Sequence, residues 1–217
     1  MPTPKVWFTS DLHVRHKHIL KHCPERIEVM GLEGLEGEEA MQKHDEYILK
    51  LWNMTVAKKD IVYILGDFTF APREWAIKYL AKMNGEKHLI IGNHDQSSHN
   101  LAGYFKTINQ IKHQTFKKSV YPFLEEDFQV SMCHYPFVTW ASKHHGCVAL
   151  HGHCHGRLDD FNARSTDLRV DVGLDGQLAK YGLVSLEQVY KHLKEKAGGR
   201  SLERYAIDMR NDNGMII

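Results

Sequence analysis

Five short, mainly apolar runs in this chain each lead into aspartate, histidine or asparagine, and this repeated arrangement constrains the fold most strongly. Runs of this length are typical of buried strands. Ligands of α/β proteins bind where such strands end. We therefore expect the polar residues after the five runs to meet in one site, assembled from the whole chain. The runs are 6–8, 61–65, 88–91, 128–132 and 148–150.

The polar residues at these strand ends have the chemistry of metal ligands. Aspartate, histidine and asparagine without thiolate suit Mn, Fe, Zn, Ni or Co, and we expect manganese. Such a set is too large for one tetrahedral ion and suits two divalent ions that share a carboxylate. Asp67 stands alone in its cluster and midway along the set, so it is the expected bridge. The candidate ligands are Asp11, His13, Asp67, Asn93, His134, His153 and His155.

The charge of such a site predicts an anionic substrate. Two divalent cations outweigh the ligand carboxylates Asp11 and Asp67, so the site is locally cationic although the chain has a formal net charge of only +1. A local field of this sign attracts phosphate without a basic surface. We therefore expect a phosphate ester as the substrate, with nucleotides among the candidates.

His94 is the histidine left over next to the candidate ligands. It lies between Asn93 and Asp95, so we expect it at the rim of the site rather than under a metal. An imidazole oriented by a neighbouring carboxylate can donate a proton to a leaving alkoxide. His94 and Asp95 are therefore the predicted catalytic residues.

These clusters, in this order, resemble the calcineurin-like metallophosphoesterase superfamily, and the resemblance extends from about residue 5 to residue 190. It implies an α/β fold, a four-layer αββα sandwich of two mixed β-sheets flanked by helices. It also implies hydrolysis of phosphate esters by metal-bound hydroxide. The matching segments are Asp11-Leu12-His13, Gly66-Asp67, Gly92-Asn93-His94-Asp95, His134 and Gly152-His153-Cys154-His155.

The resemblance also implies a role for each ligand. One metal would take Asp11, His13, Asp67 and His155, and the other would take Asp67, Asn93, His134 and His153. His94 would assist the leaving group.

The segment 10–16 is similar to a compact bacterial and phage branch of the superfamily, which tends to read Asp-x-His-x-Gly-His. Arg15 stands where that branch has glycine. We expect Arg15 and His16 to contact the substrate. The segment 171–175 resembles a late Val-Gly-x-Asp element of the same branch, whose task is less uniform.

The spread of ligands predicts one domain. Residues 11 to 155 must meet in a single site, so we expect one domain over 1–217, with a core of about 5–193 and a C-terminal appendage over 194–217. We find neither the apolar region of a signal peptide nor the roughly 20 apolar residues of a membrane helix. The four cysteines form no CxxC pair. We therefore expect a cytoplasmic enzyme without a membrane segment, and its oligomeric state stays open.

Helical periodicity predicts helices over 39–56, 73–83 and 186–193, the last with Ser185 as its N-cap. The glycine-rich, acidic segment 25–39 is interpreted as a surface loop, either shaping the mouth of the site or simply solvated. In the tail, 202–209 is a candidate helix or strand. Six histidines without a strand-end setting are expected on the surface: His22, His44, His88, His99, His113 and His192.

The sequence favours a phosphodiesterase and leaves three alternatives. A phosphomonoesterase would use the same site. A nuclease acting on DNA or RNA ends would usually carry a basic patch with aromatic residues. Here 58–59 and 117–118 are isolated lysine pairs, which give no clear patch of this kind. A non-catalytic protein-binding scaffold would have lost ligands or the catalytic histidine, whereas this chain has all of them.

Overall fold

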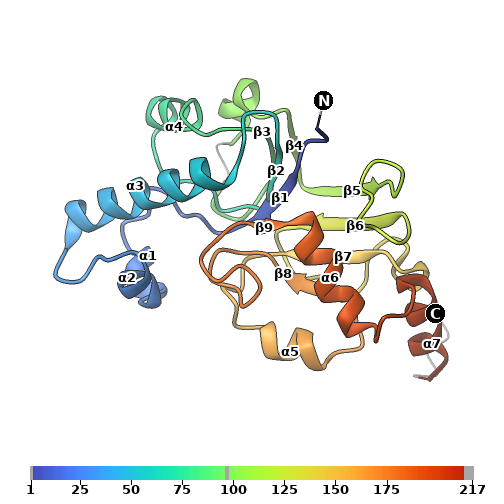
Figure 1. The fold of residues 1–217 in the computed structure, drawn as a ribbon. Helices are drawn as coiled ribbons and strands as arrows, with labels where there is room; N and C mark the ends of the chain where they lie inside the picture. Colours follow the sequence, from blue (N-terminus) through green and yellow to red (C-terminus); the bar gives the residue numbers. More distant parts are fainter. Residues whose placement is uncertain (1, 96–97, 213–217) are drawn as a thin grey trace.

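The computed structural model describes residues 2–95 and 98–212, and two mixed β-sheets form its centre (Figure 1). In the larger sheet the first four strands are parallel, and the edge strand β9 pairs antiparallel with β1. Its spatial order is β4 (Thr107–Asn109), β3 (Glu86–Ile90), β2 (Ile61–Ile64), β1 (Val6–Thr9) and β9 (Val184–Ser185).

The smaller sheet has four strands, of which β5 and β6 are antiparallel and the others parallel. Two mixed sheets flanked by helices are the architecture that the sequence predicts, so the fold class is confirmed. The order of strands is β5 (Ile111–Phe116), β6 (Phe128–Cys133), β7 (Val148–His151) and β8 (Arg169–Asp171).

Alternation along the strands divides the hydrophobic core into two main clusters. Phe8 and Tyr63 face the space between the sheets, where they pack with Phe116 and Phe128 of the smaller sheet. Val62 and Ile64 point to the opposite face of the larger sheet, as expected for a side-chain period of two. One cluster therefore joins the two sheets, and the other joins the larger sheet to helices.

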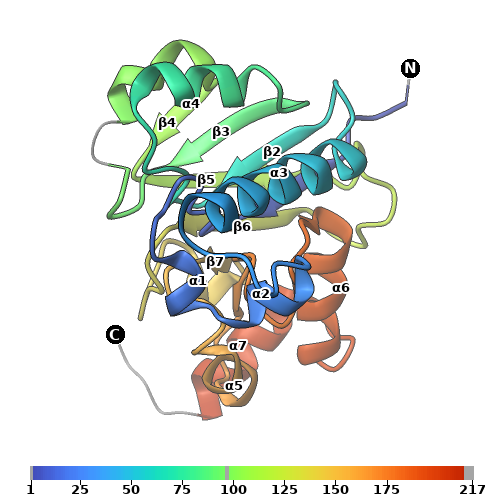
Figure 2. The same ribbon diagram turned by 90° about the vertical axis from the view of Figure 1, so that its left-hand side faces the viewer.

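The outer face of the larger sheet is covered by α3 (Gly37–Thr55) and α4 (Arg73–Leu80). Figure 2 shows these helices beside β2 and β3. Trp52 and Tyr79 bury their rings there, and Trp52 donates its indole N–H to the Asn84 carbonyl. Both predicted helices are thus present, with α3 starting two residues early and α4 ending three residues early.

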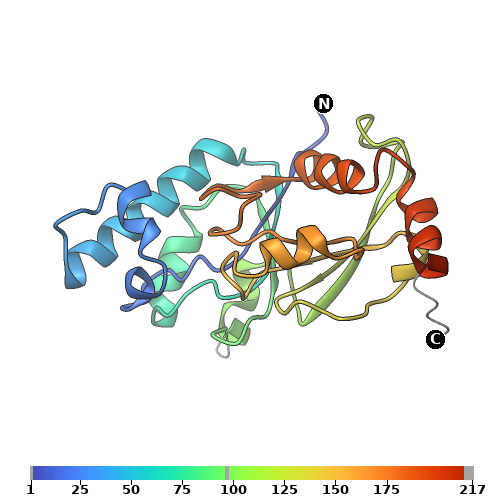
Figure 3. The ribbon, with the colours of Figure 1, turned by 90° about the horizontal axis from the view of Figure 1, so that it is seen from below.

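The remaining helices are short, apart from α6 (Leu186–Lys196) and α7 (Leu202–Asp212). Ser185 caps α6 as predicted, and its hydroxyl accepts the Gln188 backbone N–H in a capping box. Helix α7 lies at the opposite end of the molecule from α1 and α2 (Figure 3). The others are α1 (Ile19–His22), α2 (Glu25–Val29), α5 (Asp159–Arg164) and the 3-10 turns η1 (Ser98–Tyr104) and η2 (Lys143–His145).

Two expectations about surface residues are wrong. Residues 25–29 form α2 rather than a loop, and Arg26 within it is completely buried. His44 and His88 are also buried, and each has polar partners: His44 contacts Arg26 and Asp45, and His88 contacts Thr107 and Glu86. Among the other histidines expected on the surface, His22, His113 and His192 are exposed, and the side chain of His99 lies outside the described residues.

In the tail, α7 contributes Leu202 and Tyr205 to the cluster between the sheets. The helix therefore packs on the fold. No helix among the described residues combines the length and the apolar character that crossing a membrane requires.

Candidate metal centre

The candidate ligands come from loops at the carboxyl ends of strands in both sheets. Backbone bonds hold these loops together: the N–H of Asp11 donates to the Gly66 carbonyl, and the N–H of Gly152 donates to the His134 carbonyl. The His153 backbone N–H also donates to Asp11 Oδ2 at 2.9 Å and so joins a loop of the smaller sheet to one of the larger sheet. The site therefore lies where the two sheets meet. Asp11 and His13 follow β1, Asp67 follows β2, Asn93 follows β3, His134 follows β6, and His153 and His155 follow β7.

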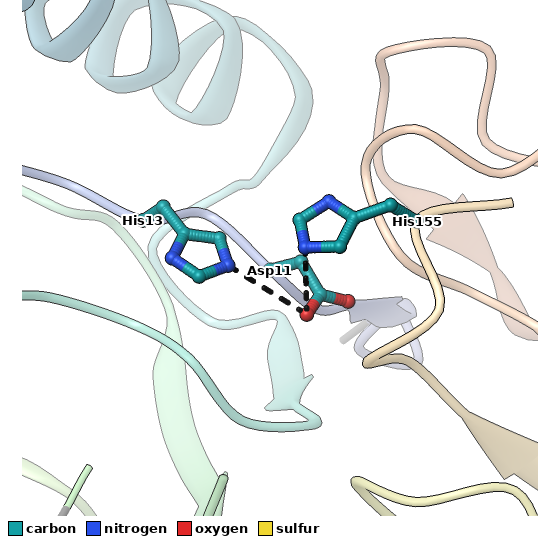
Figure 4. Close-up of side chains that lie close together, drawn as sticks. All are labelled: Asp11, His13 and His155. Carbon is teal, nitrogen blue, oxygen red and sulfur yellow. Dashed lines mark ion pairs between the residues drawn. The ribbon is translucent and has the colours of Figure 1, made fainter. Parts of the chain in front are cut away.

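Asp11, His13 and His155 form the first group of potential ligands. Figure 4 shows both imidazoles directed at the same carboxylate oxygen. The Nε2 atoms of His13 and His155 lie 3.9 and 3.8 Å from Asp11 Oδ1. These atoms surround one position at which a cation would contact an oxygen and two nitrogens.

Asp67, His134 and His153 form the second group. His134 Nε2 lies 3.5 Å from Asp67 Oδ2 and 3.2 Å from His153 Nδ1. The side-chain oxygen of Asn93 is 3.0 Å from the same His134 nitrogen. This arrangement brings together the four residues that were expected to hold one ion.

Asp67 joins the two groups. Its Oδ2 atom lies 3.6 Å from His13 Nε2 in the first group and 3.5 Å from His134 Nε2 in the second. One carboxylate oxygen is therefore directed toward both positions.

His13 tests whether these residues fit a metal. It is buried, and neither of its ring nitrogens has a hydrogen-bond partner among the described residues. Buried polar atoms of native proteins are nearly always satisfied, so such a group needs a specific explanation. Burial also lowers the pKa of His13 to about 2, which keeps the ring neutral, as metal binding requires. The residues present thus fit a divalent ion.

The two aspartates of the site differ in their proton affinity. Burial raises the pKa of Asp11 to about 6. Burial acts in the same direction on Asp67, but contacts with His134 and the backbone N–H of His94 outweigh it and lower the pKa to about 2. The bridging candidate is therefore charged over the whole neutral range.

Five of the seven candidate ligands have left-handed backbone conformations. The φ angles are +57° at Asp11, +50° at His13, +52° at Asp67, +70° at His153 and +49° at His155. For residues other than glycine such conformations cost about 1–3 kcal/mol each, and they concentrate at functional sites. The surrounding contacts must hold these loops in place. Gly152 shows how tightly they are packed, because a Cβ atom there would collide with Ser10 and Asp11.

Asp175 supports His155 from behind. Its Oδ2 atom lies 2.6 Å from His155 Nδ1, which leaves Nε2 directed at Asp11. A carboxylate that accepts from the second ring nitrogen fixes the tautomer and orientation of a metal-binding histidine. Although burial opposes it, the bond to Asp175 raises the pKa of His155 to about 10. Asp175 is the aspartate of the Val-Gly-x-Asp element, so this element supports His155.

Cys23 lies next to this pair, with Sγ 3.2 Å from His155 Nδ1 and 3.6 Å from Asp175 Oδ2. The three residues are close enough to bind a cation. However, both oxygens of Asp175 also contact the guanidinium of Arg26, which would repel one. We interpret the group as hydrogen-bonded support for His155. Neither Cys23 nor Arg26 is recognisable from the sequence as part of the site.

Asp95 has a different position from the one expected. Its carboxylate accepts the backbone N–H groups of Asp67, Phe68 and Gly92, at 2.7, 3.0 and 2.9 Å. Both oxygens are engaged in this way, so Asp95 fixes the loops after β2 and β3 rather than orienting the ring of His94.

His94, His16 and Arg15 lie at the rim. The half-exposed ring of His94 has its Nε2 atom 4.0 Å from Asp67 Oδ2. His16 stacks on Phe70 at 4.1 Å, and Phe70 lies 4.6 Å from the His94 ring. Arg15 instead points to α3 and α4, where its guanidinium binds Glu38 at 2.6 Å and covers Trp75.

Comparison with known proteins agrees with this geometry. Residues 4–175 match the model of the calcineurin-like phosphoesterase family, which confirms the resemblance seen in the sequence. The Gene 66 protein of Mycobacterium phage L5 is 28% identical over 89% of this chain and 97% of its own length. An uncharacterized protein of Methanocaldococcus jannaschii is 25% identical over 90% of this chain and 94% of its own.

A solved structure has the same fold. The crystal structure of a protein of unknown function from Aquifex aeolicus superposes with a TM-score of 0.60 and 21% identity. The similarity covers 87% of this chain and 99% of that one.

Proposed function

Because the chain belongs to the calcineurin-like phosphoesterase family, whose members use bound metal to hydrolyse phosphate esters, we propose that it is a dinuclear phosphodiesterase. Asp11, His13, Asp67 and His155 would hold the first ion, and Asp67, Asn93, His134 and His153 the second. The observation that carries this proposal is the position of Asp67 Oδ2, 3.6 Å from His13 and 3.5 Å from His134.

The donor set suits manganese, with Fe, Zn, Ni or Co as alternatives, because oxygen and imidazole ligands occur without thiolate. When bound, two such ions would acidify a water molecule and neutralise charge on the phosphoryl group. The neutral ring of His13 and the ionised carboxylate of Asp67 are the protonation states in which these residues bind a cation.

His94 would act on the leaving group. Its ring is exposed at the rim, and its backbone N–H donates to Asp67 Oδ1 at 2.9 Å. The imidazole is thereby held beside the site without being a ligand itself. In this position it would protonate the departing alkoxide of a phosphate ester in the site.

A phosphodiester suits the site better than a monoester. A diester carries one negative charge, which repels an attacking oxygen less than the dianion of a monoester does. Two exposed aromatic rings flank the centre: Phe70 beside His94, and Tyr135 beside His153. Each offers an apolar surface to one ester substituent, and nucleosides are substituents of this kind.

We place the enzyme in the cytoplasm. Cys23, Cys133 and Cys147 are buried free thiols, and Cys154 is a half-buried one. Unpaired cysteines of this kind are typical of reducing compartments. Fractionation of the source cells tests the assignment.

A metal-by-substrate matrix tests the proposed activity. The protein would be saturated with Mn²⁺, its metal content measured, and its rates compared on p-nitrophenyl phosphate, bis-p-nitrophenyl phosphate and 2′,3′-cyclic nucleotides. We expect two ions per chain and faster turnover of the diesters. At most one ion in a fully active preparation would contradict the dinuclear centre. Faster turnover of the monoester would instead favour a phosphatase.

A further inference from the structure

Arg26 is a completely buried arginine that lies directly behind the metal centre. Burying a guanidinium is costly unless its hydrogen bonds are satisfied. Here Nε, Nη1 and Nη2 all have partners. Because all three nitrogens are hydrogen-bonded, the surroundings of Arg26 are specific for a buried guanidinium.

The first set of partners leads to His155. Arg26 Nε donates to Asp175 Oδ1 and Nη2 donates to Oδ2, both at 2.7 Å, which is the bidentate geometry of an arginine–carboxylate pair. Asp175 in turn contacts His155 Nδ1 at 2.6 Å. The guanidinium therefore sets the position of the carboxylate that orients this candidate ligand.

The second set leads to the loop after β1. Nη2 donates to the Asp11 carbonyl at 2.7 Å, and Nη1 donates to the Leu12 carbonyl at 3.3 Å. These two peptide groups lie between the side chains of Asp11 and His13. One guanidinium thus contacts the backbone that carries two candidate ligands and the carboxylate that holds a third.

This loop needs such support because its backbone is strained. Asp11, His13 and Arg15 alternate along it with φ angles of +57°, +50° and +62°. Left-handed conformations at residues other than glycine persist only where surrounding contacts determine them. Arg26 binds the carbonyls at the start of the loop, and Asp45 Oδ1 accepts the Arg15 backbone N–H at 3.1 Å at its end.

Arg26 is itself held from α3. Nη1 donates to His44 Nε2 at 3.0 Å, and His44 Nδ1 contacts Asp45 Oδ1 at 3.1 Å. His44 is completely buried, and burial lowers its pKa, so it is the neutral acceptor that the arginine requires. A continuous path of side chains therefore runs from α3 through α2 to the ligands.

We propose that Arg26 is the positioning residue for the first ion, the one assigned to Asp11, His13, Asp67 and His155. The inference rests on the proposed two-ion centre. It assigns Arg26 to the first ion only. Besides His44, its partners are the Asp11 and Leu12 carbonyls, which lie between the side chains of two first-ion ligands, and Asp175, which contacts a third ligand, His155. None of its hydrogen bonds reaches Asn93, His134 or His153. Lysine cannot replace it, since an ammonium group lacks the planar fork that binds Asp175 and the carbonyls together.

The test compares Mn²⁺ binding by the full-length Arg26→Lys and Arg26→Met variants with that of the unmodified chain. Calorimetry and elemental analysis give affinity and stoichiometry, and electron paramagnetic resonance distinguishes a coupled pair of Mn²⁺ ions from an isolated one. Loss of an outer-shell partner typically lowers metal affinity about 10–100-fold. We expect that loss for the first ion and much less for the second, with the spectrum of an isolated ion at intermediate Mn²⁺ concentration.

Arg169→Met is the matched control. Arg169 is also buried, but it donates to the Asn162 side chain and the Phe137 carbonyl, neither of which belongs to a candidate ligand. We expect this variant to be less stable and still to bind both ions. If Arg26→Met binds both ions with unchanged affinity and only melts earlier, the inference is overturned. If that variant does not fold, Arg26→Lys and Asp175→Asn decide by the same measurement.

The outcome separates the two proposals. An unmodified chain that binds one ion would contradict the dinuclear centre alone, provided that Arg26→Met and His13→Ala both weaken that ion. A single ion unaffected by either change would overturn the positioning role as well.

Discussion

Asp67 and His94 are joined twice, through a 2.9 Å bond from the His94 backbone N–H to Asp67 Oδ1 and through a 4.0 Å approach of His94 Nε2 to Oδ2. The carboxylate that points toward both proposed metal positions therefore also places the imidazole proposed for the leaving group. Loss of Asp67 should affect metal binding and catalysis together. Loss of the His94 ring should affect catalysis alone.

Asp67→Asn should weaken both ions, because it removes the one charge shared by the two groups of ligands. Elemental analysis after equilibration with Mn²⁺ measures this. Asp60→Asn is a suitable control, since Asp60 is a buried carboxylate bound to Lys5, Trp7 and Ala57 at the other end of β2. An Asp67→Asn protein with two tightly bound ions would rule out the bridge.

His94→Gln should keep nearly normal metal content while slowing turnover by about 10²–10⁴-fold, the usual contribution of one general acid. The loss should be greatest for alkyl diesters, whose alkoxides need a proton, and smaller for p-nitrophenyl esters, whose phenolate departs without one. Rates across a series of leaving groups provide the measurement. Equal losses throughout the series would mean that His94 binds phosphate or positions the nucleophile instead.

His16→Ala and Phe70→Ala should change substrate preference and leave the metals in place. The two rings stack at 4.1 Å on the His94 side of the centre, outside both groups of ligands. KM values for diesters with bulky and small substituents, measured with metal content, test the prediction. If His16→Ala removed an ion, His16 would be a ligand and the proposed ligand set would be wrong.

Mn²⁺ affinity should rise with pH, because metal ligands must lose their protons. Burial raises the Asp11 pKa from 3.8 to about 6, and Asp175, acting against burial, raises that of His155 to about 10. Affinity should therefore increase through pH 6 and continue to increase above it, with protons released at pH 7. Calorimetry in buffers of different ionisation enthalpy counts these protons. A pH-independent affinity between pH 5 and 8 would contradict these protonation states.

The same shift of Asp11 predicts how the metal-free protein responds to pH. The unfolded chain releases this proton near pH 3.8 and the folded chain near pH 6, so the folded state binds more protons in between. The contribution of Asp11 to stability is present below pH 3.8 and is lost as pH rises through 6. The unfolding free energy of the metal-free protein should therefore decrease between pH 3.8 and 6, and Asp11→Asn should abolish this decrease. Chemical denaturation at several pH values measures both.

Leu202→Ala should destabilise the fold by about 2–5 kcal/mol, the usual cost of emptying a buried leucine site. Leu202 is 2% exposed and packs in the cluster between the sheets. Ile207→Ala on the exposed side of the same helix is the control, and urea unfolding is the measurement. Equal effects of the two changes would mean that α7 contributes little to the core.

Much of this architecture was predictable because the strands and the ligands are encoded locally. The run 61–65 is apolar and Gly66-Asp67 interrupts it, so the end of β2 is visible in a few consecutive letters. The capping box of α6 is likewise local, since Ser185 and Gln188 are three residues apart.

The parts that the sequence does not reveal depend on contacts between distant residues. Arg26 and Asp175 are separated by 149 residues, and neither is recognisable as buried without the other. Asp95 follows His94 directly, which suggested a pair, but the fold places its carboxylate over three backbone N–H groups. In the sequence, His44 has the position of a surface residue on a helix, because its buried partner Arg26 belongs to another helix.

The antiparallel pairing of β1 with β9 has a consequence for the order of events during synthesis. Trp7 and Phe8 can pair with Ser185 and Val184 only after most of the chain has been synthesised, because these partners lie near its C-terminal end. Until then, one edge of the first strand has unpaired backbone groups that can recruit other strands. Nascent chains that stop before residue 184 should therefore depend on chaperones or aggregate, whereas chains that extend past α6 close this edge themselves.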